Sequence, residues 1–460
     1  MNRNRWPHEE IDEPLGRNDR LIDVHRLTSS IFLRSRLALL TLFLCPPLMG
    51  QQVPRHATLS QVTRAPRAHR MLVGYFPQWG LYSDTPYTVK ALVESRGAAM
   101  LDQINYAQGF VKDGRCSVAD PNADMYHPFD AASSVSGVTD PADAQLKGYF
   151  GQLLELKRLY PKLKVLISLE GRAADFAADA RPEQRVAFVA SCVNLFLRGN
   201  VAPGVSALGL FDGIDVDWEF PGGADAANFV PLLEEFRKQM DAVRPGLLLN
   251  VALGPSPKPY GTDLARLAGL VDQAGLMTYD FNGPWSRTTG LIAPLVSASP
   301  DDDSVERSVT AWKAAGMPPQ KLLIGLPFYG YGWREVATEN HGYGQDGRPI
   351  RGDRPYRFIH SMIPREPLAG DGSSAAVVYR DPLSQAPWLF DGSSFWTYED
   401  PVSIESKASY AEQQQLGGFM VWELSGDTAD ATLLKAAHGA LTQTPGSGAV
   451  RKSLDSTARP

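Results

Sequence analysis

From residue 70 onward, short apolar runs alternate with segments whose apolar residues recur at the spacing of an amphipathic helix. The apolar runs predict eight strands, at 71–76, 103–107, 164–169, 213–219, 247–253, 273–279, 322–326 and 418–422. Between them, helices are predicted over 144–160, 185–197, 231–243 and 305–315. Strands that are apolar on both faces and alternate with helices indicate a parallel sheet covered by helices. Eight such units predict a closed (β/α)8 TIM barrel over residues 70–440. An open doubly wound sheet is the competing architecture, but no glycine-rich phosphate turn follows the first strand.

The connection between the seventh and eighth predicted strands is too long for an ordinary loop. It covers residues 334–400 and contains several patterned segments. We therefore expect an α+β insertion subdomain at this point of the α/β barrel. Residues 51–69 are expected to be a linker, and residues 441–460, which are rich in Ser, Thr, Gly and Pro, a flexible tail.

Residues 1–50 form a leader that has the features of an export signal. Arg34 and Arg36 precede the apolar run 37–44, and Gly50 follows shortly after it. This pattern is typical of a signal peptide cleaved near Gly50, which predicts a secreted protein, extracellular or periplasmic. A disordered tail with a chance apolar patch is the alternative. The run is much shorter than the ~20 apolar residues that span a bilayer, so we expect no stable membrane insertion.

Composition narrows the possible partners. The chain has 460 residues, of which 43% are hydrophobic and 21% charged, as in ordinary globular proteins. Its net charge of −6 provides no basic footprint, so we expect no nucleic-acid partner. The 8 histidines show no paired ligand spacing, and we expect neither a metal nor another cofactor. We expect a monomer.

Two cysteines lie within the predicted barrel, Cys116 and Cys192. They could form one disulfide outside the cytoplasm or remain two separate buried thiols. Because Cys192 falls within a predicted helix and Cys116 in a predicted loop, we expect separate thiols.

The fourth predicted strand contains an unusual run of acids, DGIDVDWE at residues 212–219. Alternate side chains of a strand share a face, so Asp215, Asp217 and Glu219 point one way and the intervening Ile, Val and Trp point toward the helices. Three carboxylates inside a barrel are costly to ionise together, and a purely structural core would not contain them. They therefore indicate an active site at the carboxyl-terminal mouth of the barrel.

The position of these acids suggests glycoside chemistry. Glu219, nearest the mouth, is placed to protonate a glycosidic oxygen, and Asp217 is placed to tune it. A retaining glycosidase ordinarily has a second carboxylate across the sugar, but Asp217 is on the same strand as Glu219. The acetamido oxygen of the sugar could act as the nucleophile instead, with Asp217 holding the amide nitrogen. This restricts the substrate to N-acetyl sugars.

The segment DGIDVDWEFP at residues 212–221 closely resembles the signature of family 18 glycoside hydrolases, the chitinases. Other segments are similar to strands of that family: GYF at 74–76, NYA at 105–107, MTYD at 277–280, GLPFYG at 325–330 and GGFMVW at 417–422. The predicted insertion resembles that of the deep-cleft branch of the family.

The resemblance implies a role for each matching residue. Glu219 would be the acid/base, Asp217 would orient the acetamido group, Asp215 would share a proton with Asp217, and Tyr279 would donate a hydrogen bond to the reacting carbonyl oxygen. The implied substrate-binding residues are Asp280, Trp422, Tyr75, Ser168, Met277, Trp285 and Trp79. Among these, Tyr75 and Ser168 would bond to Asp215 from behind, and Trp422 would form the floor under the scissile sugar. Four tryptophans either line outer sugar subsites or are packing residues: Trp79, Trp285, Trp333 and Trp388.

The chain departs from the family pattern at the end of the third predicted strand. The family sequence Ser-x-Gly-Gly, often followed by Trp, is replaced by SLEGR at 168–172. Glu170 either turns outward to meet Arg172 or adds a fourth carboxylate near Asp215. Because an unpaired inward acid is costly, we expect the outward orientation. Tyr331 also stands where many relatives carry a basic residue.

The resemblance implies an endo-acting, retaining chitinase that hydrolyses β-1,4-linked N-acetylglucosamine polymers. Hydrolysis of another GlcNAc-containing glycan, an N-glycan core or peptidoglycan, is an alternative. A catalytically silent chitin-binding lectin is a third hypothesis; such proteins typically lack the terminal acid, and Glu219 is present.

Overall fold

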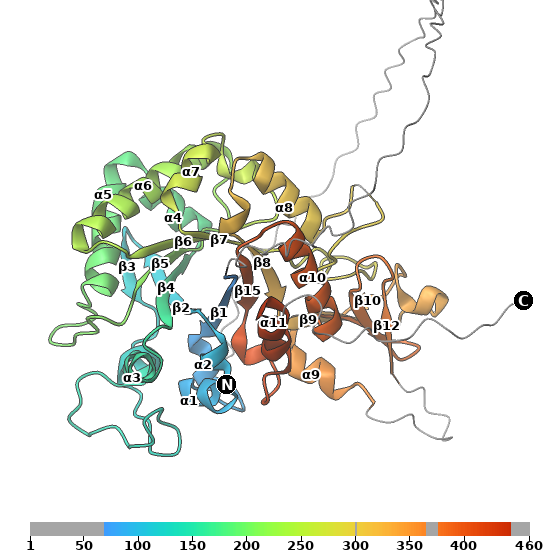
Figure 1. Cartoon of the computed structure of the whole chain (residues 1–460), viewed down its shortest axis with the longest axis horizontal. Coiled ribbons are helices and arrows are strands. Elements are labelled where there is room, and N and C mark those ends of the chain that lie inside the picture. The colour runs from blue at the N-terminus through green and yellow to red at the C-terminus, as the bar shows by residue number, and fades with distance from the viewer. Residues whose placement is uncertain (1–68, 300, 365–375, 443–460) are drawn as a thin grey trace, which may run out of the picture. The chain divides into compact units, whose positions relative to one another are not determined.

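In the computed structural model, which describes residues 69–299, 301–364 and 376–442, parallel strands close into a barrel (Figure 1). The strands are β1 (Met71–Pro77), β2 (Gln103–Lys112), β4 (Lys164–Gly171), β5 (Gly213–Val216), β6 (Leu248–Leu253), β7 (Gln273–Leu276), β8 (Leu322–Pro327) and β15 (Gly418–Trp422). They pair in the order β1-β15-β8-β7-β6-β5-β4-β2, and β2 pairs with β1 to close the ring. The predicted (β/α)8 TIM barrel and its eight strands are confirmed.

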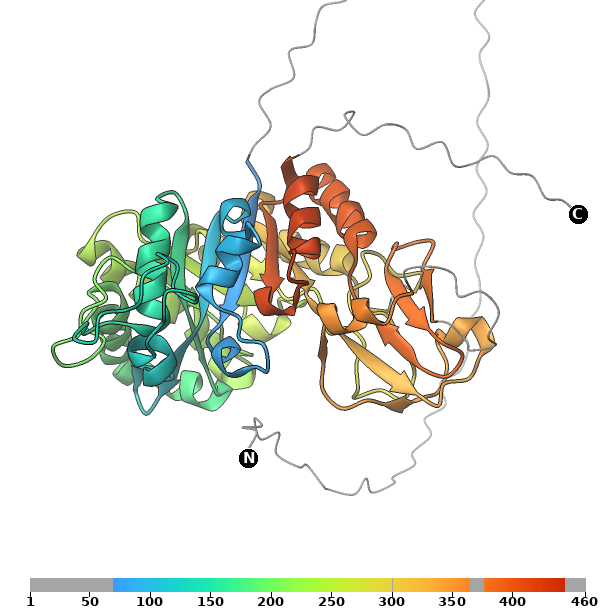
Figure 2. The same cartoon turned by 90° about the horizontal axis from the view of Figure 1, so that it is seen from below.

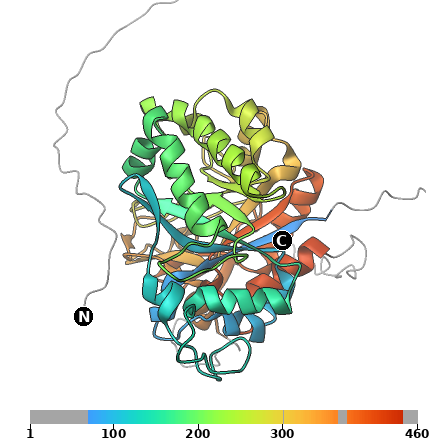
Figure 3. The same cartoon turned by 90° about the vertical axis from the view of Figure 1, so that its left-hand side faces the viewer.

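Helices pack around the outside of this barrel (Figure 3). They are α1 (Val89–Glu94), α2 (Gly97–Met100), α3 (Gly148–Leu159), α4 (Ala173–Asp179), α5 (Pro182–Cys192), α6 (Ala226–Val243), α7 (Leu264–Leu270), α8 (Val305–Ala314), α10 (Pro401–Gln413) and α11 (Thr432–Thr442). The helix predicted from residue 144 begins only at Gly148, whose φ of 57° turns the chain there. A Cβ atom at Gly148 would lie 2.5 Å from the backbone of Asp124, so a larger residue would not fit.

An antiparallel sheet is inserted between β8 and β15 (Figure 2). It consists of β9 (Tyr329–Arg334), β10 (Arg348–Pro349), β11 (Arg354–Pro355), β12 (Val377–Arg380), β13 (Pro387–Phe390) and β14 (Phe395–Thr397), with the short helix α9 (Tyr356–Ser361). This sheet confirms the predicted insertion between the seventh and eighth barrel strands. Trp333, Trp388 and Phe395 are buried together in it, so these two tryptophans are packing residues rather than exposed platforms.

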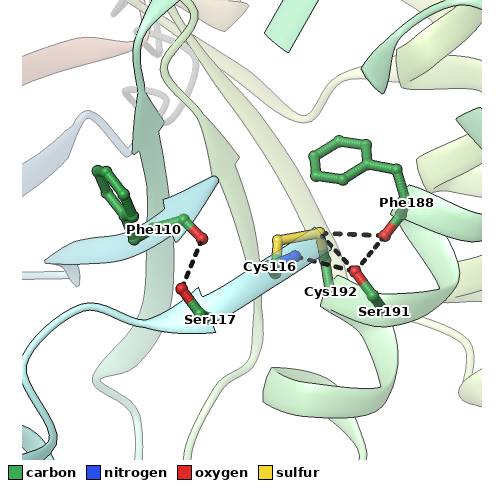
Figure 4. Close-up of a disulfide and its surroundings, with 6 residues drawn as sticks. All are labelled: Phe110, Cys116, Ser117, Phe188, Ser191 and Cys192. Atoms are coloured by element: carbon green, nitrogen blue, oxygen red, sulfur yellow. Dashed lines mark hydrogen bonds between the residues drawn. A yellow bond between two sulfur atoms is a disulfide. The ribbon is translucent and has the colours of Figure 1, made fainter. Parts of the chain in front are cut away.

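The two cysteines form a disulfide, which contradicts the expectation of separate thiols (Figure 4). Asp113 and Gly114 both have positive φ and form a two-residue hairpin between β2 and β3 (Arg115–Val118). The hairpin folds β3 back beside α5, where Cys116 lies 4.8 Å from Cys192 between Cα atoms. Asp-Gly is a strong hairpin signal in sequence, and the reversal of the chain at this pair is what brings Cys116 to α5.

Several predictions concern residues outside the described part of the chain. These are the leader at 1–50 with its cleavage near Gly50, the linker up to residue 68, and the tail from residue 443. Within the described ranges, no helix has both the length and the apolar character that crossing a membrane requires.

Replacing Cys116 and Cys192 together by Ala is expected to lower the free energy of unfolding by about 2–4 kcal/mol, because the disulfide closes a loop across 76 positions of sequence. Urea unfolding followed by tryptophan fluorescence measures this. Wild-type protein treated with dithiothreitol serves as the control and should unfold at the midpoint of the double variant. Equal midpoints for the oxidised wild type and the variant would show that the disulfide does not stabilise the fold.

Candidate active site

The acidic run lies along β5 and continues just past its end. In the register between β4 and β5, Ser168 is opposite Asp215, so both side chains face the barrel interior. Beyond Val216, the Asp217 N–H donates to the Leu169 carbonyl oxygen at 3.0 Å, which keeps the chain alongside β4. The ring of Trp218 points outward and stacks on Phe176 of α4, with centroids 5.7 Å apart. The predicted alternation of side chains therefore holds beyond the strand itself.

Asp215 is held at the bottom of the site by two hydroxyl groups. Tyr75 donates to its Oδ2 at 2.6 Å and Ser168 at 3.0 Å. Both contacts are those that the family resemblance implied. Burial raises the pKa of Asp215 to about 6, while the hydrogen bonds from Tyr75, Ser168 and Asn105 act in the opposite direction. Asp215 is thus a fixed carboxyl group that can change protonation near neutral pH.

The two carboxyl groups above Asp215, those of Asp217 and Glu219, also have raised pKa values. Burial, followed by the proximity of Glu219, Glu170 and Asp215, raises the pKa of Asp217 well above its usual range. Asp217 is 7% exposed, and its Oδ1 has no hydrogen-bond partner within the described structure. Burial and then Asp280 also raise the pKa of Glu219. A carboxylic acid that keeps its proton toward neutral pH can act as a general acid.

These acids open into a cavity of about 350 Å³ at the carboxyl ends of the barrel strands, a volume typical of ligand sites. Seven of the predicted site residues line it: Tyr75, Asp217, Glu219, Met277, Tyr279, Asp280 and Trp422. Asp215 and Ser168 are buried beneath it. The cavity is also lined by residues that were not predicted: Phe220, Ala252, Pro255, Phe281, Asp303, Tyr329 and Met420.

Some of these missed residues had a signal in sequence and others had none. Met420 stands two positions before Trp422 on β15, so strand alternation places the two side chains on one face. Tyr329 belongs to the GLPFYG segment, in which no role had been assigned to it. Asp303, Phe220 and Pro255 come from connections between elements, whose course cannot be inferred from periodicity.

An aromatic surface forms one side of the cavity. The Trp422 ring at the end of β15 lies 5.2 Å from the ring of Tyr75 and 6.0 Å from that of Trp79. Trp79, on the 3-10 helix η1 (Gln78–Tyr82), is 43% exposed and extends this surface outward. Trp285 is 61% exposed, packs edge-on against Tyr331 and does not line the cavity. Flat apolar rings of this kind can hold the apolar faces of sugars.

Asp280 and Tyr279, which follow β7, line the same cavity as Asp217 and Glu219. Tyr329 donates a hydrogen bond to Asp280 Oδ1 at 2.7 Å. Burial raises the pKa of Asp280, and hydrogen bonds from Tyr329 and Tyr331 lower it. Tyr331, at the position where a basic residue is common in the family, thus supplies a neutral donor. Tyr279 packs against Gly325, where a Cβ atom would lie 2.8 Å from its ring.

Glu170 turns inward, which contradicts the predicted outward orientation. Arg172 pairs with Asp175 through two hydrogen bonds of 2.8 Å. Glu170 lies two residues after Ser168 on β4, so strand alternation directs it to the same interior face. Its Oε1 is buried without a hydrogen-bond partner, and burial, together with Glu219 and Asp215, raises its pKa to about 8. If Glu170 keeps its proton, no unpaired charge is buried, and the free-energy cost that had argued against the inward orientation is reduced.

The described residues contain no group of three or more His, Cys, Asp or Glu side chains arranged to hold a metal ion.

Comparison with known proteins adds an independent observation. The family model "Glycosyl hydrolases family 18" matches residues 71–427. Chitinase C of Streptomyces lividans is 33% identical over 373 residues, which are 78% of this chain and 57% of that protein. Chitinase A1 of Niallia circulans is 29% identical over 439 residues, or 83% of this chain and 60% of that protein. The chain thus spans less than two thirds of the length of these relatives.

Solved structures agree with the sequence comparison. The catalytic domain of psychrophilic chitinase B from Arthrobacter TAD20 superimposes with a TM-score of 0.72 at 31% identity, over 81% of this chain and 95% of that one. A family 18 N-acetylglucosaminidase from Paenibacillus barengoltzii gives a TM-score of 0.63 at 28% identity, over 81% and 99% respectively.

Asp217→Asn is expected to stabilise the fold increasingly as pH rises. The folded-state pKa of Asp217 is raised, so its protonated form contributes stability below the unfolded-state pKa near 4, and this contribution is lost as pH rises toward the folded-state pKa. The variant should match the wild type near pH 4 and be more stable than the wild type at pH 8, by a margin that grows as pH rises, measured by urea unfolding.

Asp212→Asn is the matched control from the same segment. Asp212 Oδ2 accepts hydrogen bonds from Lys157 Nζ at 2.8 Å and from the Val165 N–H at 3.0 Å, so its neutralisation should destabilise the fold at pH 8. If both variants were destabilised alike at that pH, the prediction that the charge of Asp217 destabilises the folded state would be contradicted.

Proposed function

The chain belongs to glycosyl hydrolase family 18, and we propose that it is a chitinase that cleaves the β-1,4 linkages of N-acetylglucosamine polymers with retention of configuration. The observation that carries this proposal is the position of Glu219. It is a carboxyl group with a raised pKa that follows the buried Asp217 by two residues and lines the same cavity as the Trp422 ring. This combination suits protonation of a glycosidic oxygen on a sugar that lies against an aromatic ring.

In the first step, Glu219 donates its proton to the glycosidic oxygen and the bond from that oxygen to the anomeric carbon breaks. The carbonyl oxygen of the substrate's own acetamido group forms a bond to this carbon, which gives a cyclic oxazolinium ion. Asp217 accepts a hydrogen bond from the acetamido N–H, and Tyr279 donates one to the acetamido oxygen. As positive charge develops, the proton of Asp217 passes toward Asp215, whose pKa of about 6 suits proton exchange near neutral pH.

In the second step, Glu219 acts as the base. It takes a proton from a water molecule, whose oxygen attacks the anomeric carbon from the side that the leaving group vacated. The oxazolinium ring opens, the acetamido group is restored, Glu219 is protonated again, and the proton on Asp215 returns to Asp217. Two displacements at one carbon return the β configuration. The route by way of the acetamido group is supported by the position of Asp217, which follows the same strand as Glu219 and cannot attack from the opposite face.

The polymer and the location of the protein belong to the same proposal. The named relatives are chitinases, and a chain of linked sugars suits a cavity whose aromatic surface continues outward through Trp79. An endo-acting, monomeric enzyme is the simplest form of this proposal. The disulfide between Cys116 and Cys192 supports export to an oxidising compartment, as does the basic and apolar pattern before Gly50.

Hydrolysis of another GlcNAc-containing glycan is the second candidate. It is favoured by the structural similarity to an N-acetylglucosaminidase, whose name does not specify chitin. A silent lectin is disfavoured because Glu219 is present and lines the cavity.

Incubation with chitin oligomers, an N-glycoprotein and peptidoglycan side by side, with products identified by mass, tests the substrate. We expect release of short N-acetylglucosamine oligomers from chitin oligomers only. Glu219→Gln should lower kcat by 10²-fold or more and leave oligomer binding measurable by calorimetry, because it removes the acid proton and conserves shape. Glu183→Gln, at an exposed position of α5, is the control and should keep wild-type rates. Near-normal turnover by Glu219→Gln would remove this residue from its role.

Proton NMR of the first product tests the stereochemistry. Hydrolysis of a chitin tetramer should release a new reducing end in the β configuration, which then equilibrates slowly with the α form. An α anomer as the first product would overturn the mechanism with acetamido participation and indicate direct attack by water.

A further inference from the structure

Glu170 is a buried carboxyl group of the site that the proposed mechanism does not use. It extends from the inner face of β4, two residues beyond Ser168, beside the segment in which Asp217 and Glu219 follow β5. The Asp217 N–H is bonded to the carbonyl oxygen of Leu169, the residue before Glu170. This contact holds the two segments side by side.

Among the described residues, the charged groups that shift the pKa of Glu170 are both acids, Glu219 and Asp215. On β2, the residue opposite Glu170 in the register is Phe110, which does not titrate. Arg172 is directed to Asp175 on α4. The titratable groups that interact with Glu170 are Asp215, Asp217, Glu219 and Tyr279. All of these groups are acids, so each negative charge in the cluster opposes the loss of a further proton.

We propose that Glu170 is a positioning residue for the catalytic proton: its carboxylate, formed at alkaline pH, holds the last proton on Asp217 and Glu219 and thereby extends hydrolysis to higher pH. The inference rests on the proposed role of Glu219 as the acid. It adds a residue that interacts with the proton donor and is not itself required to touch the substrate.

The direction of the effect follows from electrostatics. The reaction requires a proton on Glu219, so the rate falls on the alkaline side when the cluster releases that proton. An ionised Glu170 raises the pKa of Asp217 and of Tyr279. Because Glu219 in turn interacts with Asp217, the charge on Glu170 opposes release of the last proton from this pair. Removal of this charge therefore lets the last proton leave at a lower pH. A smaller uncharged residue, such as the glycine that the family pattern has at this position, would not have this effect.

The test is the pH dependence of kcat/KM on a chitin oligomer between pH 4 and pH 10. Glu170→Gln should move the alkaline limb of the profile to lower pH by about one unit, a shift typical of the loss of one nearby like charge. Glu170→Asp keeps the charge, so its alkaline limb should lie close to that of the wild type. Glu183→Gln removes one exposed carboxylate that does not line the cavity and should leave the profile unchanged. An alkaline limb of Glu170→Gln that superimposes on the wild type, or moves to higher pH, overturns the proposal.

A second measurement needs no folded Gln variant. Carbon-13 NMR of wild-type protein labelled at glutamate carboxyl groups should show a glutamate signal that titrates near pH 8 and is absent in Glu170→Asp. The signal of Glu423, whose pKa burial raises to about 7, should remain in that variant. If every glutamate carboxyl group titrated below pH 6, the proposal would be wrong whatever the variants do.

The two tests also separate this inference from the proposed function. Absence of chitin-oligomer hydrolysis by the wild type at every pH would contradict the proposed function, whereas the NMR titration would still decide whether Glu170 holds a proton. Normal hydrolysis with an unshifted alkaline limb in Glu170→Gln would contradict the inference and leave the proposed function intact.

Discussion

The burial of several carboxyl groups on one interior face is the constraint on which the site depends. Parallel strands in register direct alternate side chains inward at the same level, so β4 and β5 together bring Ser168, Glu170, Asp215 and Asp217 to one place. Withdrawal from water disfavours the charged form of each acid and makes it retain its proton. The hydroxyl groups of Tyr75 and Ser168 compensate only Asp215. The acids above it therefore keep a labile proton, which is what transfer to a leaving oxygen requires.

Much of the fold was predictable because its determinants are periodic. Apolar strands alternate with amphipathic helices along the chain, and closure of the barrel follows from the number of these units. The error over Cys116 and Cys192 had a different origin. Two residues, Asp113 and Gly114, turn the chain back on itself, and this local reversal decides which helix β3 meets. Periodicity carries no information about such a contact, although the turn residues themselves do.

The residues of the candidate site also fall into those that periodicity predicts and those that it does not. Residues on barrel strands or directly after them, such as Trp422 and Asp217, could be predicted to line the cavity because alternation fixes their direction. Asp303 lies in a connection, where direction depends on tertiary packing, and it was missed. Glu170 was misplaced for an energetic reason: the cost of an inward charge was weighed without the possibility that the group stays neutral. Alternation along β4 was the more reliable guide.

The connections of the inserted sheet have a consequence for binding. Only Phe328 separates β8 from β9, and its N–H donates to the carbonyl oxygen of Trp422 at 2.7 Å. At the other end, the buried Glu399 pairs with the buried Lys407 of α10. The sheet strands β9, β13 and β14 are thus joined to the barrel at both ends, so much of the entropy cost of ordering them arises when the chain folds. Less of this cost is then left to oppose the association of a ligand with the site beside them.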